Sequence, residues 1–149
     1  MMYLDSAIIV KLLVREKDSA FFNRSIVGQE LWSSELALVE VRSAILIKER
    51  EKLLSAPERK SAFARFESLC SGKSLHLHPL NSVVVERAAG LLANCHPEAP
   101  LRSLDAIHLA TALLRSRGPL CTTDGRLRTA AQRIGVPCFP KELSEIANS

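Results

Sequence analysis

The regular alternation of short apolar segments with longer helical ones constrains the fold of this chain more than any other feature of its sequence. Strands are expected over residues 2–4, 30–33, 75–78, 120–122 and 136–139. Helices are expected over 6–14, 19–26, 34–50, 56–71, 82–93, 103–116 and 124–134, with a short last helix from Lys141. Strands that alternate with helices in this way form a parallel sheet with helices on both faces. The sequence therefore predicts an α/β fold in three layers, without indicating the order of the strands.

Length and composition point to one globular domain over residues 1–149. The chain is long enough to bury a sizeable core, and it contains no linker, repeat or low-complexity tract. Hydrophobic residues make up 47% and charged residues 24%, as in globular proteins rather than disordered ones. Aromatic residues are only 5%, so the core must consist mainly of Leu, Val, Ile and Ala. Such a core favours helices packed on a small sheet over an all-β sandwich.

Several classes of protein are disfavoured by the same sequence. No apolar run approaches the ~20 residues that cross a bilayer. Met1 and Met2 lead directly into the first expected strand, so we expect no signal peptide and a cytoplasmic location. The cysteines lack the spacing of a zinc knuckle or a redox pair. The net charge of +4 is compatible with a polyanionic partner but too small to identify one.

Four acidic residues lie just after expected strands or near the beginning of expected helices. Asp5 and Asp124 each follow a strand, Asp105 lies in the first turn of a helix, and Glu40 lies about two turns into another. In a parallel α/β fold the carboxyl ends of the strands and the amino ends of the helices share one edge of the sheet, where ligands bind. We therefore expect Asp5, Glu40, Asp105 and Asp124 to meet at that edge.

Glu40 has the least usual surroundings of the four. The helix around it is apolar on nearly all sides, so we expect it to be largely buried. Leu36, Ser43 and Ile47 share the helical stripe of Glu40, and a carboxylate on a core-facing stripe is costly unless it is paired or bound to a cation.

A cluster of carboxylates predicts a hard divalent cation, Mg²⁺ or Mn²⁺. Like charges in one place raise each other's pKa unless a cation compensates them. We therefore expect Glu40→Gln to leave the metal-free protein at least as stable as the wild type. Such a site could activate water and neutralise charge on a phosphodiester.

Each acid also has a purely structural interpretation. Asp5 is a good helix N-cap, Asp124 with Gly125 is typical of a turn, Asp105 could complement a helix dipole, and Glu40 could pair with a base. If all four interpretations hold, the chain is a non-catalytic module that binds RNA or protein. What favours a shared site is the common edge of the sheet.

The segments that carry these acids resemble the motifs of the PIN-domain family, and within it the VapC-type toxins. They are Met2–Ala7 for Asp5, Ser33–Ala44 for Glu40, Leu104–Ala112 for Asp105 and Leu120–Leu127 for Asp124. The motif around Asp105 is the most specific, and the four follow the family's order and spacing over nearly the whole chain.

The resemblance implies a PIN-like fold and RNA cleavage that depends on Mg²⁺ or Mn²⁺, with the four acids as metal ligands. It also implies a homodimer that a small antitoxin inhibits. The family often has a further acid after the fourth motif, whereas this chain has Arg126 and Arg128 there, which disfavours a second metal site. A PIN nuclease of RNA processing is an alternative to a toxin, although the extra domains that such roles often use are absent.

Several further residues are candidates for the same site. Ser6 and Thr122 could bond to a ligand carboxylate or the metal's water, or could simply act as caps. The cations expected near the edge, and so able to contact phosphate, are Lys11, Arg102, Arg126 and Arg128.

The histidines and aromatic residues favour structural roles. His108 is expected to be a packing residue rather than a catalytic one. His76 and His78 share one strand face but lack a third metal ligand. Trp32 is expected in the core. Phe63 and Phe66 are also expected there, or alternatively along a groove for an antitoxin helix.

Overall fold

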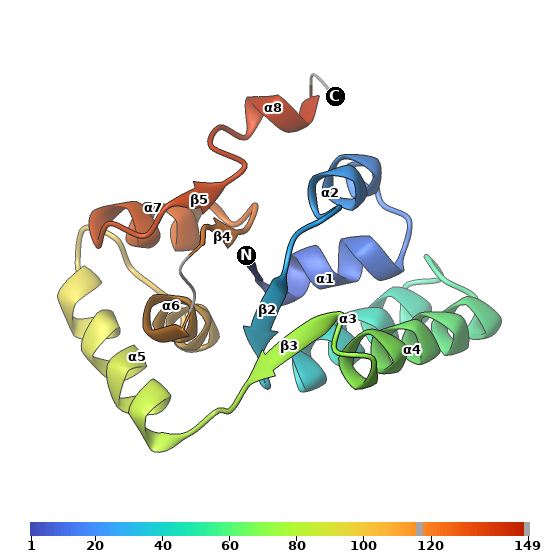
Figure 1. Ribbon diagram of the computed structural model, residues 1–149, viewed down its shortest axis with the longest axis horizontal. Coiled ribbons are helices and arrows are strands. Elements are labelled where there is room, and N and C mark those ends of the chain that lie inside the picture. The colour runs from blue at the N-terminus through green and yellow to red at the C-terminus, as the bar shows by residue number, and fades with distance from the viewer. Residues whose placement is uncertain (116–117, 148–149) are drawn as a thin grey trace.

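A five-stranded parallel sheet forms the centre of the protein, in the order β3-β2-β1-β4-β5 (Figure 1). The computed structural model describes residues 1–115 and 118–147. The strands are β1 (Met2–Leu4), β2 (Leu31–Ser34), β3 (Leu75–His78), β4 (Leu120–Cys121) and β5 (Cys138–Phe139). All five lie where the sequence predicted a strand, and all pair in parallel.

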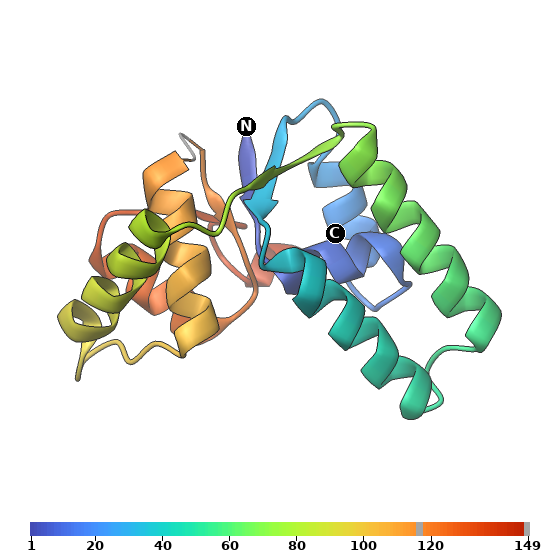
Figure 2. The same ribbon diagram turned by 90° about the horizontal axis from the view of Figure 1, so that it is seen from below.

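Helices cover both faces of this sheet, which confirms the expected three layers (Figures 1 and 2). One layer contains α1 (Ser6–Leu13), α2 (Ser19–Ser25), α3 (Ala37–Arg50) and α4 (Ala56–Ser71). The other contains α5 (Ser82–Cys95), α6 (Ser103–Arg115) and α7 (Gly125–Arg133), and α8 (Ser144–Ala147) lies near the C-terminus. The expected end of the sixth helix at Ser116 lies outside the described residues. Within the described part of the chain, no helix is long and apolar enough to cross a membrane.

The central strand supplies side chains to a core on each face of the sheet. Met2 and Leu4 pack with the helices α1 to α4, whereas Tyr3 packs with α5 to α7. This division follows from the strand period of two residues, which sends successive side chains to opposite faces. Because all three residues are almost completely buried, β1 is held from both sides.

The strand order places a topological switch point between β1 and β4. From β1 the chain adds β2 and β3 on one side, and it then returns to add β4 and β5 on the other. Leu4 of β1 is paired with Cys121 of β4, so the residues that follow these strands lie side by side. Ligands of open α/β sheets bind beyond the carboxyl ends of the strands at such a point.

α3 and β5 begin later than expected, for local reasons. α3 begins at Ala37 rather than Ser34, because Ser34 belongs to β2 and its hydroxyl accepts a hydrogen bond from the Leu36 N–H. β5 begins at Cys138 rather than Val136, since the Val136 N–H donates to a carbonyl of α7 and Pro137 has no N–H to donate.

The expectation that α3 is largely buried is wrong. Its buried residues are Ala37, Val41 and Ile45, which form a single stripe. Val39 is 69% exposed and Ile47 is 40% exposed. The apolar residues around Glu40 therefore face solvent as well as the core.

Candidate active site

Asp5 lies directly after β1 and caps α1. Its Oδ1 accepts a hydrogen bond from the Ile8 N–H at 2.8 Å, which confirms the N-cap interpretation. Its backbone N–H donates to the carbonyl of Cys121, 3.2 Å away across the switch point. The carboxylate also has a hydrogen bond with the Thr122 side chain. Asp5 is thus a buried carboxylate fixed by both strands.

Asp124 caps α7 in the same manner. Its Oδ1 accepts hydrogen bonds from the N–H groups of Arg126 and Leu127, at 2.8 and 3.0 Å. Its own N–H donates to Oγ1 of Thr122 at 3.1 Å. Thr122 is completely buried and contacts both Asp5 and Asp124. The structure therefore places Thr122 between two of the expected site residues.

Capping does not prevent either aspartate from binding a cation. The helix-capping bonds of Asp5 and Asp124 all end on Oδ1. A carboxylate has two oxygens with about four acceptor positions, so each residue retains capacity for another ligand. The structural and functional interpretations of these residues are compatible.

Asp105 has a buried carboxylate oxygen that lacks a hydrogen-bond partner among the described residues. The residue lies in the first turn of α6, and this oxygen is its Oδ2. Burial raises the pKa of Asp105, and the neighbouring charge of Asp124 raises it further. The guanidinium of Arg102 acts in the opposite direction without cancelling the shift.

Asp5, Asp105 and Asp124 form what we call the acidic edge. Burial also raises the pKa of Asp5, and the charge of Asp124 adds to that effect. The hydrogen bonds of Asp5 with Thr122 and Ile8 lower its pKa but do not offset the burial. The acidic edge is therefore a group of carboxylates with uncompensated negative charge, the donor chemistry that suits Mg²⁺ or Mn²⁺.

Glu40 is directed to a neighbouring group. Its Oε2 accepts hydrogen bonds from the Ser6 hydroxyl and the His108 ring, both at 2.7 Å. Burial would raise the pKa of Glu40, but the hydrogen bonds with His108 and Ser6 lower it below its usual range. Because its charge is favoured here, this pairing argues that Glu40→Gln destabilises the metal-free protein, contrary to the expectation from the sequence.

The base paired with Glu40 is His108 rather than a neighbour on its own helix. Arg42 instead donates to the Leu38 carbonyl and to Glu67. As expected, His108 is a packing residue, and it is only 3% exposed. Its contact with Glu40 was not predicted, because the two residues are 68 positions apart in the sequence.

The four expected acids lie near one another, but their side chains are not gathered around a common point. Among residues 1–115 and 118–147, no three acid, histidine or cysteine side chains are arranged to hold one ion together. Local bonds account for this separation, since Asp5 and Asp124 are held by helix ends and Glu40 by His108 and Ser6.

Two of the four cations expected to contact phosphate have other roles. Arg128 is buried, and its guanidinium donates to the carbonyls of Thr122 and Lys141. This pairing supports the loop beneath the acidic edge and argues against a contact with phosphate. Arg102 and Arg126 are exposed and remain candidates.

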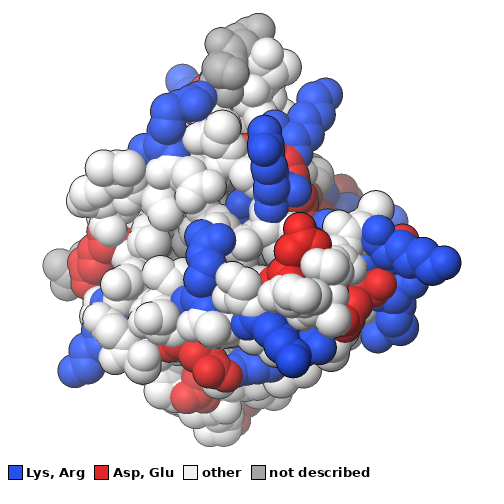
Figure 3. Space-filling view, turned by 90° about the vertical axis from the view of Figure 1, so that its right-hand side faces the viewer, with Lys and Arg blue, Asp and Glu red and all other residues white. Residues whose placement is uncertain are grey.

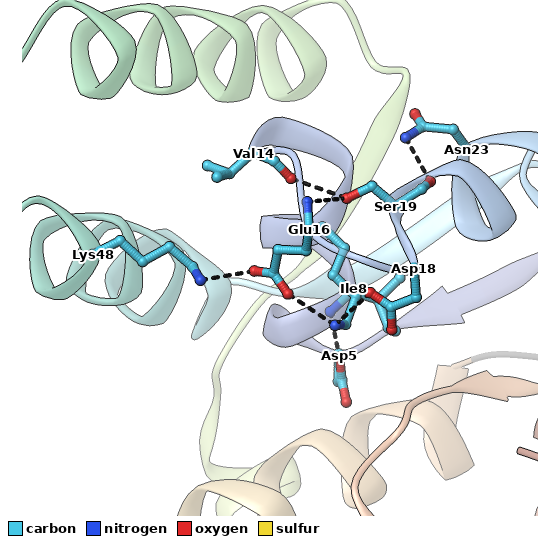
Figure 4. A network of polar contacts seen from close by, with 9 residues as sticks. Asp5, Ile8, Val14, Glu16, Asp18, Ser19, Asn23 and Lys48 are labelled. Carbon is cyan, nitrogen blue, oxygen red and sulfur yellow. Dashed lines mark hydrogen bonds and ion pairs between the residues drawn. The ribbon is translucent and has the colours of Figure 1, made fainter. Parts of the chain in front are cut away.

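Lys11 is the other cation with an internal role. Its Nζ lies 2.9 Å from both Glu16 and Asp18, and Lys48 binds the second oxygen of Glu16, also at 2.9 Å. We call Lys11, Glu16, Asp18 and Lys48 the lysine network. Figure 4 labels Glu16, Asp18 and Lys48 of this network together with Asp5. Burial opposes the charge of Lys11, yet its bonds with Asp18 and Glu16 raise its pKa. Its charge is thus already compensated.

The remaining candidates pack within the protein. The rings of His76 and His78 stack on Trp32, with centroids 4.7 and 5.6 Å away. Phe66 is completely buried, so it cannot line an open groove, whereas Phe63 is half-buried. These contacts confirm the structural interpretation for Trp32 and Phe66.

The surface has no single basic field on the side shown in Figure 3. Lys and Arg side chains are interspersed with Asp and Glu there. Positive and negative side chains are thus mixed over this side of the protein.

Comparison with known proteins identifies the family. Residues 2–132 match the PIN domain. Ribonuclease VapC46 of Mycobacterium tuberculosis is 40% identical over 137 residues, covering 90% of this chain and 92% of that protein. FitAcB from Neisseria gonorrhoeae has a TM-score of 0.70 at 20% identity, over 95% of this chain and 98% of that one. A toxin–antitoxin complex from Klebsiella pneumoniae has a TM-score of 0.58 at 20% identity, over 83% and 87%. The chain therefore belongs to the PIN-domain family, together with the VapC ribonucleases.

Proposed function

We propose that this PIN-domain ribonuclease is a metal-dependent endonuclease that cleaves RNA at the acidic edge and acts as the toxin of a type II toxin–antitoxin pair. One observation carries the proposal: Oδ2 of Asp105 is buried with no hydrogen-bond partner among the described residues, in a site where burial raises the pKa of both Asp105 and Asp5. A buried acceptor of this kind is costly unless a cation or a donor satisfies it. The switch point of the sheet is also where ligands of such folds bind.

The residues that would hold Mg²⁺ or Mn²⁺ are Asp5, Asp105, Asp124 and Glu40. A divalent cation in such a site activates water and neutralises charge on the phosphodiester. Thr122 keeps Asp5 and Asp124 in place, and Ser6 does the same for Glu40. The chain's part is therefore to hold oxygen ligands in fixed positions.

The reaction is hydrolysis of a phosphodiester. The oxygen of one water bonds to phosphorus and one ester P–O bond breaks. The leaving oxygen takes up one proton, and the second is released. Arg102, just before α6, and Arg126, in the first turn of α7, are exposed beside Asp105 and Asp124. We assign them to the phosphate groups that flank the cleaved bond.

The expected partners are a small antitoxin and a second copy of the chain. The similar Klebsiella pneumoniae structure is a toxin–antitoxin complex. In this chain, Val39, Leu46 and Ile47 of α3 leave an exposed apolar stripe along the helix of Glu40. An amphipathic antitoxin segment could cover that stripe beside the acidic edge.

An RNA hairpin with a single-stranded loop, labelled at one end, tests the proposed reaction. The wild-type protein should cleave the loop with Mg²⁺ or Mn²⁺ and not with EDTA, and it should leave DNA of the same sequence intact. Asp105→Asn protein purified in parallel is the control for a contaminating nuclease. Cleavage in EDTA by the wild type, absent from the variant, would contradict metal dependence.

Co-expression with the protein encoded by the neighbouring gene tests the partners. The two proteins should purify together, and light scattering should give twice the chain's 16.4 kDa for the isolated chain. A monomer that retains no neighbouring product would contradict this part of the proposal.

A further inference from the structure

A chain of buried hydrogen bonds leads from the core of the protein to Glu40. The Tyr3 hydroxyl lies 2.9 Å from Nδ1 of His108, and Nε2 of the same ring lies 2.7 Å from Oε2 of Glu40. The Ser6 hydroxyl donates to the same oxygen. These residues come from β1, α6, α3 and α1, so four separate elements hold one carboxylate.

Solvent exposure increases along this chain of hydrogen bonds, from Tyr3 through His108 to Glu40. Tyr3 is 1% exposed and His108 is 3% exposed, whereas the Glu40 side chain is 24% exposed. The first two groups are therefore inaccessible to RNA or to bulk water, and Glu40 is the end that a ligand can reach.

The donors and acceptors of the chain have a consistent order. Glu40 can only accept, so Nε2 of His108 carries the hydrogen of that bond. The Tyr3 hydroxyl meets Nδ1 on the other side of the ring. The ring is therefore held between Tyr3 and Glu40, with its Nε2–H directed at the carboxylate.

The two carboxylate oxygens of Glu40 differ in their hydrogen bonding. Oε2 receives both Ser6 and His108, whereas Oε1 has no hydrogen bond among the described residues. Holding one oxygen fixes the direction of the other. A packing histidine needs only satisfied nitrogens, but this one also orients a carboxylate at the edge of the site.

The geometry points to His108 as a positioning residue that, with Tyr3 behind it and Ser6 beside it, aims Oε1 of Glu40 at the divalent cation. This inference rests on the proposed function, because it takes Glu40 as a metal ligand. Groups that orient a metal ligand in this way typically change the metal affinity about 10–100-fold when they are removed.

Two amide substitutions of matched polarity separate positioning from packing. The amide of His108→Gln reaches the place of Nε2, whereas that of His108→Asn reaches only the place of Nδ1. Affinity for Mn²⁺ alone is measured by calorimetry, with thermal melts in EDTA to confirm that each variant folds. We expect His108→Asn to weaken Mn²⁺ binding about tenfold or more. His108→Gln should stay within about threefold of the wild type, since it restores the donor.

The same substitution in a Glu40→Gln background tests the route of the effect. If His108 acts through Glu40, His108→Asn should cause no further loss once that carboxylate is gone. An equal loss in both backgrounds would overturn the inference, as would unchanged Mn²⁺ affinity in folded His108→Asn.

Three further outcomes are decisive. If His108→Asn does not fold, Ser6→Ala removes the other donor to Oε2 and should weaken Mn²⁺ binding about threefold or more, so unchanged binding would overturn the inference. Wild-type protein that binds no Mn²⁺ would overturn the proposed function together with this inference. Tight wild-type binding that is insensitive to these changes would overturn this inference alone.

Discussion

The acidic edge and the lysine network contain the same kind of acidic side chain in opposite electrostatic states. In the lysine network, bonds with Lys11 and Lys48 lower the pKa of Glu16 although burial opposes this. At the acidic edge, burial raises the pKa of Asp5 and Asp105, and Asp124 adds to both shifts. The first group contains its own cations, whereas for the second we propose a cation from outside. Substitutions that remove one charge should therefore have opposite effects in the two regions.

The largest contrast should be in catalysis. Asp105→Asn replaces a proposed carboxylate ligand of the acidic edge by a neutral amide, whereas Glu16→Gln removes one carboxylate charge from the lysine network. Loss of a metal's contribution of several kcal/mol corresponds to about a hundredfold or more in rate. We expect that loss in the initial rate of RNA cleavage for Asp105→Asn and a change within about twofold for Glu16→Gln. Equal losses in the two variants would remove the distinction between the regions.

Removing the central cation of the lysine network should destabilise the fold. Lys11→Met leaves Glu16 and Asp18 close together, with side chains that are only 24% and 17% exposed. We expect a loss of about 2 kcal/mol, between the values for exposed and buried ion pairs. Thermal melts should show a Tm about 4–8 °C lower. Lys17→Met is the matched control because Lys17 is exposed, and a similar loss there would contradict this role of Lys11.

Asp105→Asn should have the opposite effect in EDTA, and the effect should depend on pH. The raised pKa of Asp105 means that the wild type loses stability as pH rises from about 4, the usual value for Asp, through the folded-state pKa. The variant avoids this loss. It should therefore match the wild type near pH 4 and melt about 2–4 °C higher at neutral pH, a gain of about 1 kcal/mol. The measurement is a series of thermal melts in EDTA across this pH range. A difference in Tm between variant and wild type that does not change with pH would contradict the prediction.

The outer cation of the lysine network should matter least. Lys48 binds only one oxygen of Glu16, and both side chains are 24% exposed. Lys48→Met should cost about 0.5 kcal/mol, or about 1–2 °C in Tm. Chemical denaturation should show a shift of the same size. A loss of stability as large as that of Lys11→Met would contradict the greater contribution of Lys11 to the network.

The elements that the sequence predicted well are those with local signals. Asp5 ends β1 and caps α1, and Gly135, with a φ of +77°, closes α7 as expected. Pro57 and Gly72 mark the two ends of α4, which spans the expected residues. In each case the side chain or backbone conformation of nearby residues determines the boundary.

The features that the sequence did not predict depend on contacts across the fold. The order of the strands, and hence the pairing of β1 with β4, has no local signal. Lys11 was expected to contact phosphate because the sequence cannot show that the next loop supplies Glu16 and Asp18 to it. For the same reason, the common edge of the four acids could be inferred, but the contact of Glu40 with His108 could not.

Four thermal melts test most directly whether the acidic edge is a cation site: wild type and Asp105→Asn, each in EDTA and in Mn²⁺. An ion that binds only the folded state, at a hundred times its dissociation constant, stabilises that state by about 2.7 kcal/mol. The expected result is a crossing, in which Asp105→Asn melts higher in EDTA and the wild type melts higher in Mn²⁺. An Asp105→Asn variant that melts lower in EDTA, yet gains as much from Mn²⁺ as the wild type, would contradict a cation site at the acidic edge.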